Sequence, residues 1–181
     1  MSAPRPASFA QRIFAFLWDY LLIAGWLLGV MALGAVLMLT APGLAKTVFG
    51  DPVTGQLAGF CLVTLPVTLY FAIQESSTRH ASWGKRKRGL VVVTTLGDGI
   101  GFAHALARTL LKFVPWELSH TFVIQAAIAG QAGRDPPDWA TVVLVLAYLL
   151  IMANVISLFM NSKRQTLYDR ITGTQVMHAD I

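Results

Sequence analysis

The chain has 181 residues, of which 55% are hydrophobic and only 13% are charged, and it carries a formal net charge of +5. Soluble domains contain about 25% charged residues, because a small domain keeps much of its surface in water. The composition and the mean hydropathy of +0.61 therefore argue against a soluble domain and predict an integral membrane protein. The basic residues lie beside long apolar segments, which favours the cytoplasmic edge of a membrane protein over a nucleic-acid-binding protein.

Apolar segments suited to crossing a bilayer recur along the chain. About 20 apolar residues are needed for one crossing. The first segment exceeds this length and is too long for the apolar part of a signal peptide, so we expect it to be retained as a span. We expect one all-α domain over residues 1–181, a bundle of about four transmembrane helices at residues 13–39, 56–74, 113–130 and 139–160.

The N-terminal half contains several residues with local consequences for helix structure. Ser8 is expected to cap the first helix. Gly25 and Gly29 either let another helix approach closely or only reflect how common glycine is in membrane helices. Residues 40–55 are rich in Pro and Gly and are expected to form a loop. Pro66 removes one backbone hydrogen bond from the second span and predicts a kink there.

The segment 75–112 differs in character from the spans and is expected to be a cytoplasmic loop. Its β-branched residues 89–95 precede a Gly-rich turn and predict a short strand or hairpin. Residues 102–112 are expected to form an amphipathic helix on the membrane surface. A basic run predicts a solvated, lipid-facing patch that attracts anionic lipids at about 1 kcal/mol per charge; it consists of Lys85, Arg86, Lys87 and Arg88.

The third expected span is interrupted by polar residues and by a proline, Pro115. We therefore expect it to be short, kinked or partly re-entrant. Glu117 and His120 lie three residues apart and share a helix face. They either form a proton site within the span or mark a helix end at the membrane interface. The fourth span is uninterrupted, and residues 161–181 are expected to form a polar tail.

The placement of basic residues predicts the orientation of the chain. With the N-terminus inside, twelve of the 14 Lys and Arg residues lie in segments expected on the cytoplasmic side. The other two, Lys46 and Arg134, lie in the expected outside loops. This asymmetry predicts cytoplasmic N- and C-termini, and it requires the third span to cross. We expect a bacterial plasma membrane as the location.

An acidic residue within the first span is the most informative position. Asp19 lies seven residues after Arg12, about 10 Å along a helix on the same face. An acid inside the hydrocarbon layer costs about 2.5–3.5 kcal/mol, so it should face the protein interior. Asp19 either binds a proton, a cation or a cationic substrate group, or forms a buried ion pair. The candidate partners for such a pair are Arg12, Arg108, Lys112 and Arg170.

The ordered set of these residues resembles the RDD family, which is named for one arginine and two aspartates. The arginine and aspartate that open the family pattern match Arg12 and Asp19. A cytoplasmic pattern, T-x-G-K-x-x-x-G-L-x-V-V, is matched by residues 82–93, with Ser82 in place of the threonine. A later helix with the pattern R-x-x-x-K matches residues 108–112. The closing segment matches at Asp169, Gly173 and Thr174.

The resemblance covers nearly the whole chain and implies a membrane protein with a role in transport, since some family members are linked to sodium/proton exchange. We therefore expect a small transporter or ion exchanger with a cytoplasmic-side cluster of Arg12, Asp19, Asp169, Arg108 and Arg170. The alternative is a non-catalytic accessory subunit or assembly factor of a larger membrane complex. The chain is then expected to be a homo-oligomer or a subunit of that complex.

Other sequence signals do not favour an enzyme. The histidines lack metal-ligand spacing, and no nucleophile elbow is present. The glycines at 97–101 lack the spacing and setting of a nucleotide-binding loop. We accordingly expect no catalytic residue, cofactor, metal or nucleic-acid partner.

Overall fold

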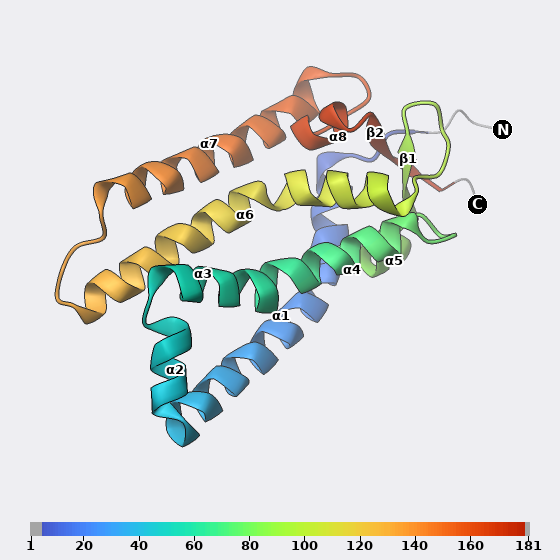
Figure 1. The fold of residues 1–181 in the computed structure, drawn as a ribbon. Helices are drawn as coiled ribbons and strands as arrows, with labels where there is room; N and C mark the ends of the chain where they lie inside the picture. Colours follow the sequence, from blue (N-terminus) through green and yellow to red (C-terminus); the bar gives the residue numbers. More distant parts are fainter. Residues whose placement is uncertain (1–4, 180–181) are drawn as a thin grey trace. The chain divides into compact units, whose positions relative to one another are not determined.

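The computed structural model of the chain describes residues 5–179, which are mostly helical (Figure 1). These residues divide into two compact units, each assembled from distant parts of the sequence. Unit 1 consists of the described parts of 1–23, 68–112 and 152–181, and unit 2 consists of 24–67 and 113–151. The expectation of one domain over the whole chain stays a prediction.

The helices account for most of the chain. The long ones are α1 (Phe9–Thr40), α6 (Phe102–Gln131) and α7 (Asp138–Met160). The short elements are α2 (Pro42–Phe49), α3 (Pro52–Gly59), the π-helical segment η1 (Phe60–Thr64), α4 (Leu65–Ser76), α5 (Trp83–Lys87) and α8 (Leu167–Ile171), with strands β1 (Leu90–Thr94) and β2 (Thr174–His178).

Three helices among residues 5–179 are long and apolar enough to cross a membrane, and they correspond to the first, second and fourth expected spans. The expected third span lies in α6, which does not meet the same standard because Glu117 and His120 interrupt its apolar stretch. The qualifying helices are Phe9–Thr40, Pro52–Ser76 and Asp138–Met160.

The start of α1 is fixed by a reciprocal pair of side-chain hydrogen bonds. The Gln11 backbone N–H donates to Ser8 Oγ at 3.3 Å, and the Ser8 N–H donates to Gln11 Oε1 at 2.9 Å. This is a capping box, in which two otherwise unpaired backbone donors are satisfied at once. The prediction that Ser8 caps the first helix is confirmed.

The loop expected at residues 40–55 was a wrong prediction, because α2 and the start of α3 lie there. Pro42 and Pro52 each stand in the first turn of a helix, where the missing N–H is not needed. Asp51 caps α3 by accepting a hydrogen bond from the Val53 N–H at 2.9 Å. Both prolines therefore begin helices instead of breaking them.

In unit 2, the proline of the second span is accommodated without a free backbone carbonyl. In an α-helix the Leu62 carbonyl would accept a hydrogen bond from residue 66, but Pro66 has no N–H. The indole Nε1–H of Trp26 donates to this carbonyl at 2.7 Å instead. The adjoining π-helical turn η1 departs from α-helical geometry, whereas the expected kink stays a prediction.

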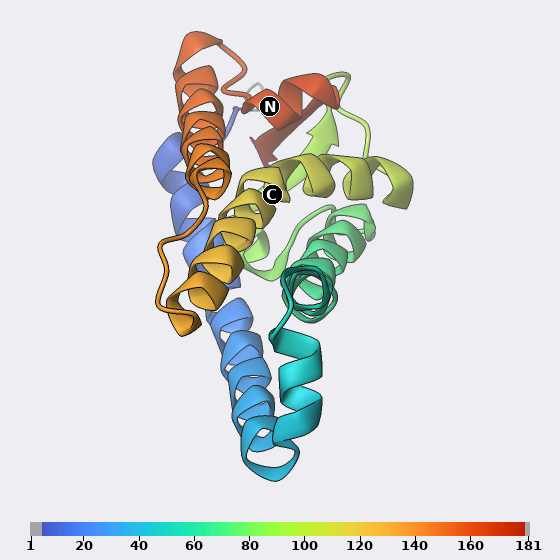
Figure 2. The ribbon, with the colours of Figure 1, turned by 60° about the vertical axis from the view of Figure 1, so that its left-hand side comes forward.

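Unit 2 also brings the second half of α6 alongside α3 (Figures 1 and 2). A Cβ placed on Gly55 or Gly59 would lie 3.5 Å or 3.7 Å from atoms of Ile124. These glycines therefore leave the space that the Ile124 side chain occupies. Thr64, farther along the same span than Gly55, hydrogen-bonds Glu117, which precedes Ile124 in α6, so the two segments run antiparallel.

The β-branched run in the cytoplasmic segment forms β1, as expected, but its main partner differs from the expected hairpin. β1 pairs antiparallel with β2 from the C-terminal tail, in a register from Leu90↔His178 to Thr94↔Thr174. Locally, β1 makes only an isolated bridge, Val93↔Gly99. The tail is thus not merely polar, because it supplies both α8 and the second strand.

A small apolar core supports this sheet in unit 1. It contains Leu90, Val92, Ile100, Ala105 and Val176, together with Ala7 and Ala15. The N-terminal segment adds to the sheet edge, since the Ala7 N–H donates to the Val176 carbonyl at 2.9 Å. The sheet therefore ties both ends of the described chain to its middle.

The separate amphipathic surface helix expected at 102–112 is also not observed. Residues 102 to 131 form the single continuous helix α6, with Pro115 inside it. Arg108, which lies in this stretch and was expected in the charge cluster, is only 1% exposed. The polar residues of this stretch therefore face the interior of unit 1.

Candidate functional site

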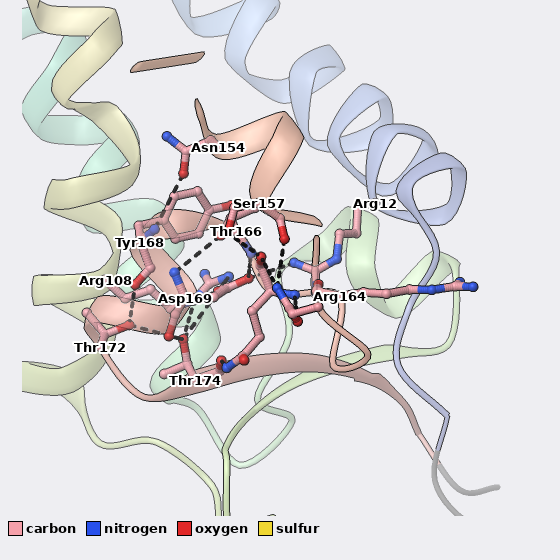
Figure 3. A network of polar contacts seen from close by, with 12 residues as sticks. Arg12, Arg108, Asn154, Ser157, Arg164, Thr166, Tyr168, Asp169, Thr172 and Thr174 are labelled. Atoms are coloured by element: carbon pink, nitrogen blue, oxygen red, sulfur yellow. Dashed lines mark hydrogen bonds and ion pairs between the residues drawn. The ribbon is translucent and has the colours of Figure 1, made fainter. Parts of the chain in front are cut away.

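A chain of four ion pairs lies buried in unit 1, and we call it the ion-pair chain. It runs from Arg12 through Asp169, Arg108 and Glu75 to Lys85. The nitrogen–oxygen distances, in that order, are 2.8, 2.7, 2.6 and 2.7 Å. Both acids are fully buried, and none of the three bases exposes more than 11% of its side chain. The ion-pair chain links α1, α8, α6, α4 and α5, and Figure 3 shows its part around Arg12, Asp169 and Arg108.

Asp169 is held in place by the helix that carries it. The Thr166 side chain accepts a hydrogen bond from the Asp169 N–H, and Asp169 accepts one from the Thr166 N–H, which forms a capping box at α8. Thr174 Oγ1 lies 3.2 Å from Asp169 Oδ1. Burial by itself would raise the pKa of Asp169, but Arg108 and Arg12 outweigh it and hold this pKa well below its ordinary range.

Arg108 is the centre of the ion-pair chain. Its Nε and Nη2 donate to Asp169 Oδ1 at 2.9 and 2.7 Å, and its Nη1 donates to Glu75 Oε2 at 2.6 Å. The guanidinium carbon lies 5.1 Å from the centroid of the Tyr168 ring. Burial would lower the pKa of Arg108, but the charges of Glu75 and Asp169 raise it further than burial lowers it. The guanidinium therefore stays charged and fixed.

Asp19 lies in unit 1 but outside the ion-pair chain. Its carboxylate accepts three hydrogen bonds, from Tyr70 Oη at 2.8 Å, Ser82 Oγ at 2.6 Å and the Gly84 N–H at 2.7 Å. Among the described residues Asp19 forms no ion pair. Its negative charge is met by neutral donors that converge on it from α4 and from the start of α5.

Gly84 permits the close approach of α5 to α1. A Cβ at this position would lie 1.9 Å from the Ala15 carbonyl oxygen and 2.9 Å from Asp19 Cγ. Only a residue without a side chain fits there. The segment Ser82–Gly84 therefore binds Asp19 through one hydroxyl and one backbone N–H, a physical role for the serine and glycine of the cytoplasmic sequence pattern.

A second polar cluster lies in unit 2, on α6 and the π-helical region. Glu117 Oε1 accepts a hydrogen bond from Gln56 Nε2, and Oε2 accepts one from Thr64 Oγ1 at 2.5 Å. His120 Nδ1 lies 3.8 Å from Glu117 Oε2. The side chains of His120 and Glu117 are 25% and 26% exposed. We call these four residues the Glu117 cluster.

The residues that form these sites lie almost entirely within a segment that matches a known protein family. The sequence model of the RDD family matches residues 6–173. The chain belongs to the RDD family. Together with its apolar helices, this membership identifies an integral membrane protein. Searches of curated proteins and of solved structures returned no match.

The residues that correspond to the RDD pattern are divided between two sites in unit 1. Arg12 and Asp169 pair directly, and Arg108 joins them, as the expected cluster required. Asp19 is separate, bound by the Ser82–Gly84 segment. Arg170 is exposed and makes no ion pair with any residue in the described range 5–179.

The basic run of this RDD protein is also divided. We expected Lys85 and Arg86 to face lipid, but Lys85 is 9% exposed with Nζ 2.7 Å from Glu75, and Arg86 donates to Gln74 Oε1 at 2.6 Å. The short helix α5 turns these two side chains inward. Lys87 and Arg88 remain exposed.

Glu75 is a central residue of the ion-pair chain that sequence reasoning did not single out. It is fully buried and binds both Lys85 and Arg108. Its position directly after an apolar span was the one indication of its role in the sequence. That signal is weak, because acids at helix ends are usually solvated.

Within residues 5–179 no group of three or more His, Cys, Asp or Glu side chains is arranged to hold a metal ion. Lys112, which was a candidate partner of Asp19, has its Nζ 3.5 Å from the centroid of the Phe71 ring. The candidate sites for function are the ion-pair chain, the donors around Asp19 and the Glu117 cluster.

Proposed function

We propose that this RDD protein is a small transporter or ion exchanger, and that Glu117 binds the transported cation or proton. The observation that carries the proposal is a partly exposed carboxylate whose nearest partners are an amide, a hydroxyl and an imidazole. Ionisable residues at membrane depth are costly and commonly mark ion or proton pathways.

The depth of Glu117 follows from its contact with Thr64. The candidate span Pro52–Ser76 has Thr64 at its midpoint, twelve residues from each end. A side chain hydrogen-bonded to this hydroxyl lies near the middle of a membrane-spanning helix. This contact supports α6 as a fourth span, with its polar residues turned toward α3 and η1 in place of lipid.

The charge balance around Glu117 also favours reversible binding. The acids of the ion-pair chain contact fixed guanidinium and ammonium groups, so a further cation would gain little there. Gln56 and Thr64 bring no formal charge to Glu117, and His120 is charged only when it is protonated. A proton or a small cation can therefore neutralise this carboxylate without displacing an arginine.

The irregular backbone next to the cluster supports the same conclusion. Thr64 ends the π-helical segment η1, and Pro66 follows it. Single π-turns inside α-helices occur frequently at functional sites, because they re-aim side chains and free backbone groups. Here the turn directs the Thr64 hydroxyl at Glu117.

The test is ion flux in proteoliposomes that contain the purified protein and a trapped pH-sensitive dye. Wild type should dissipate an imposed proton gradient, alone or on addition of a monovalent cation, and Glu117→Gln should not. Arg134→Gln, an exposed change in the same unit, serves as the control and should keep wild-type flux. Equal flux from Glu117→Gln and wild type, or no flux from folded wild type, would overturn the proposal.

A role as an accessory subunit or assembly factor is the second candidate, and the ion-pair chain favours it. Each carboxylate oxygen of its two acids pairs with a basic group. Unit 1 is therefore better suited to a rigid structural role than to reversible binding. Extraction in mild detergent followed by native mass analysis separates the two candidates. Recovery at fixed stoichiometry with a larger complex supports the accessory role, whereas recovery alone or as a homo-oligomer supports the transporter.

We further propose that both termini face the cytoplasm of a bacterial plasma membrane. The support is the distribution of basic residues, of which twelve of 14 lie in the segments assigned to that side. Each terminus can be fused to a reporter that is active only in the cytoplasm and, separately, to a reporter that is active only outside the plasma membrane. Activity of the second reporter at either terminus would contradict the proposed orientation.

A further inference from the structure

The exposed surface of unit 1 carries charge of almost one sign. Its described residues contain four acids, of which Asp19, Glu75 and Asp169 are buried and Asp98 is exposed. The exposed bases among these residues number seven. They are Arg5, Arg79, Lys87, Arg88, Lys163, Arg164 and Arg170.

Two of these bases lie over aromatic rings. Lys87 Nζ is 5.7 Å from the ring centroid of Trp83, and Arg88 Cζ is 5.6 Å from that of Phe14. Trp83 in turn meets Trp18 edge-on, with ring centroids 5.6 Å apart. Phe14 and Trp18 are 53% and 42% exposed. We call these five residues the basic–aromatic site.

We propose that the basic–aromatic site binds the headgroup phosphate of an anionic phospholipid. A guanidinium offers paired N–H donors that match phosphate geometry, and a lysine adds a point charge beside it. Tryptophan side chains favour the headgroup level of a bilayer. The site therefore combines two bases that can bind a phosphate, Lys87 and Arg88, with aromatic side chains suited to the headgroup level of the bilayer.

The location of the site on α1 selects a lipid over a soluble acidic partner. Phe14 and Trp18 belong to the first turns of the candidate span Phe9–Thr40, so lipid is the neighbour that these exposed rings meet. Leu17 and Leu21 are exposed on the same helix, at 50% and 59%. An acyl chain can lie along these side chains while its headgroup reaches Lys87 and Arg88.

The structure also narrows the size of the site. Four adjacent bases would form a diffuse patch, but Lys85 and Arg86 are turned inward to Glu75 and Gln74. Two bases remain, and together they can contact the phosphate of a single anionic headgroup. A zwitterionic headgroup carries its own cation beside the phosphate, so it should bind more weakly.

The test compares lipid retention by native mass spectrometry of the purified full chain in detergent. Phosphatidylglycerol and phosphatidylcholine of the same acyl composition are titrated separately. The double variant Lys87→Gln/Arg88→Gln should lose about 25-fold in apparent affinity for phosphatidylglycerol, at about fivefold per charge. Its affinity for phosphatidylcholine should not change.

The matched control is Lys163→Gln/Arg170→Gln, which removes the same charge from two exposed positions of the same unit. It should keep wild-type retention of phosphatidylglycerol. Equal losses from both double variants would mean diffuse attraction and would overturn the site, as would unchanged retention by Lys87→Gln/Arg88→Gln. Displacement of the lipid by millimolar inorganic phosphate would also overturn it, because free phosphate would then be the ligand.

Discussion

In unit 1 the two carboxylates of the ion-pair chain, Glu75 and Asp169, meet guanidinium and ammonium groups, whereas Glu117 in unit 2 meets an amide, a hydroxyl and an imidazole. Taking an ion out of water costs several kcal/mol, and each environment offsets this cost differently. Permanent opposite charges fix an acid in one ionisation state. Neutral partners leave the acid open to protonation or to a cation. Similar residue types therefore serve stability in one unit and, as we propose, exchange in the other.

The largest test of this contrast is Arg108→Leu, which removes the centre of the ion-pair chain. Asp169 would keep Arg12 and Glu75 would keep Lys85, but each acid would lose its most buried partner. Breaking a buried pair on one side costs about 3–5 kcal/mol. The free energy of unfolding in mixed detergent micelles should fall by about that amount. Arg170→Leu, an exposed change on α8, should stay within about 0.5 kcal/mol of wild type.

Gly84→Ala should lower the free energy of unfolding by a smaller amount. The new Cβ would meet the Ala15 carbonyl, so α5 must move away from Asp19. Overpacking of this kind costs about 1–3 kcal/mol, measured by the same unfolding assay. At Gly101 a Cβ would meet nothing within 4 Å, so Gly101→Ala is the control. Equal stability of the two variants would contradict the close packing of α5 on α1.

Acidification should lower the free energy of unfolding of unit 1. The pKa of Asp169 is held below its ordinary value of 3.8 by Arg108 and Arg12. Its stabilising contribution is therefore complete above about pH 4 and is lost as the pH falls further. The loss at pH 3 should be about 1 kcal/mol, visible as a lower unfolding midpoint. A profile that is flat from pH 6 to pH 3 would contradict this account.

The smallest expected effect on stability, less than about 1 kcal/mol, is that of Glu117→Gln. The glutamine keeps one oxygen acceptor and nearly the same volume, and the site is partly exposed. This variant should unfold like wild type while losing flux in proteoliposomes. A loss of stability as large as that of Arg108→Leu would place Glu117 with the structural acids and erase the contrast between the units.

The sequence predicted the apolar helices better than their connections. Length and hydropathy are local properties, so three of the four expected spans have matching helices. The loop at 40–55 was misjudged because Pro42 and Pro52 begin helices as readily as they end them. The strand at 90–94 was evident from its β-branched residues, but its partner at 174–178 was not, because strand pairing depends on tertiary structure.

The candidate sites were predictable only in part. The spacing of Arg12 and Asp19 placed both on one helix face, yet their partners come from different parts of the sequence. Asp169 binds Arg12, and Ser82 with Gly84 binds Asp19. These choices depend on how α5 and α8 approach α1, which no local pattern encodes. The same reason explains why four adjacent bases, alike in sequence, divide into two that bind Glu75 and Gln74 and two that are exposed.

The pairing of β1 with β2 has a consequence for the order in which the protein is made. The strand β1 lies near the middle of the chain, and 80 residues separate Thr94 from its partner Thr174. Asp169 follows Arg12 by 157 residues, so Arg12 is synthesised long before its partner. Unit 1 is therefore completed only after α7 has been synthesised, and a chain truncated after α7 should insert into the bilayer yet fail to mature.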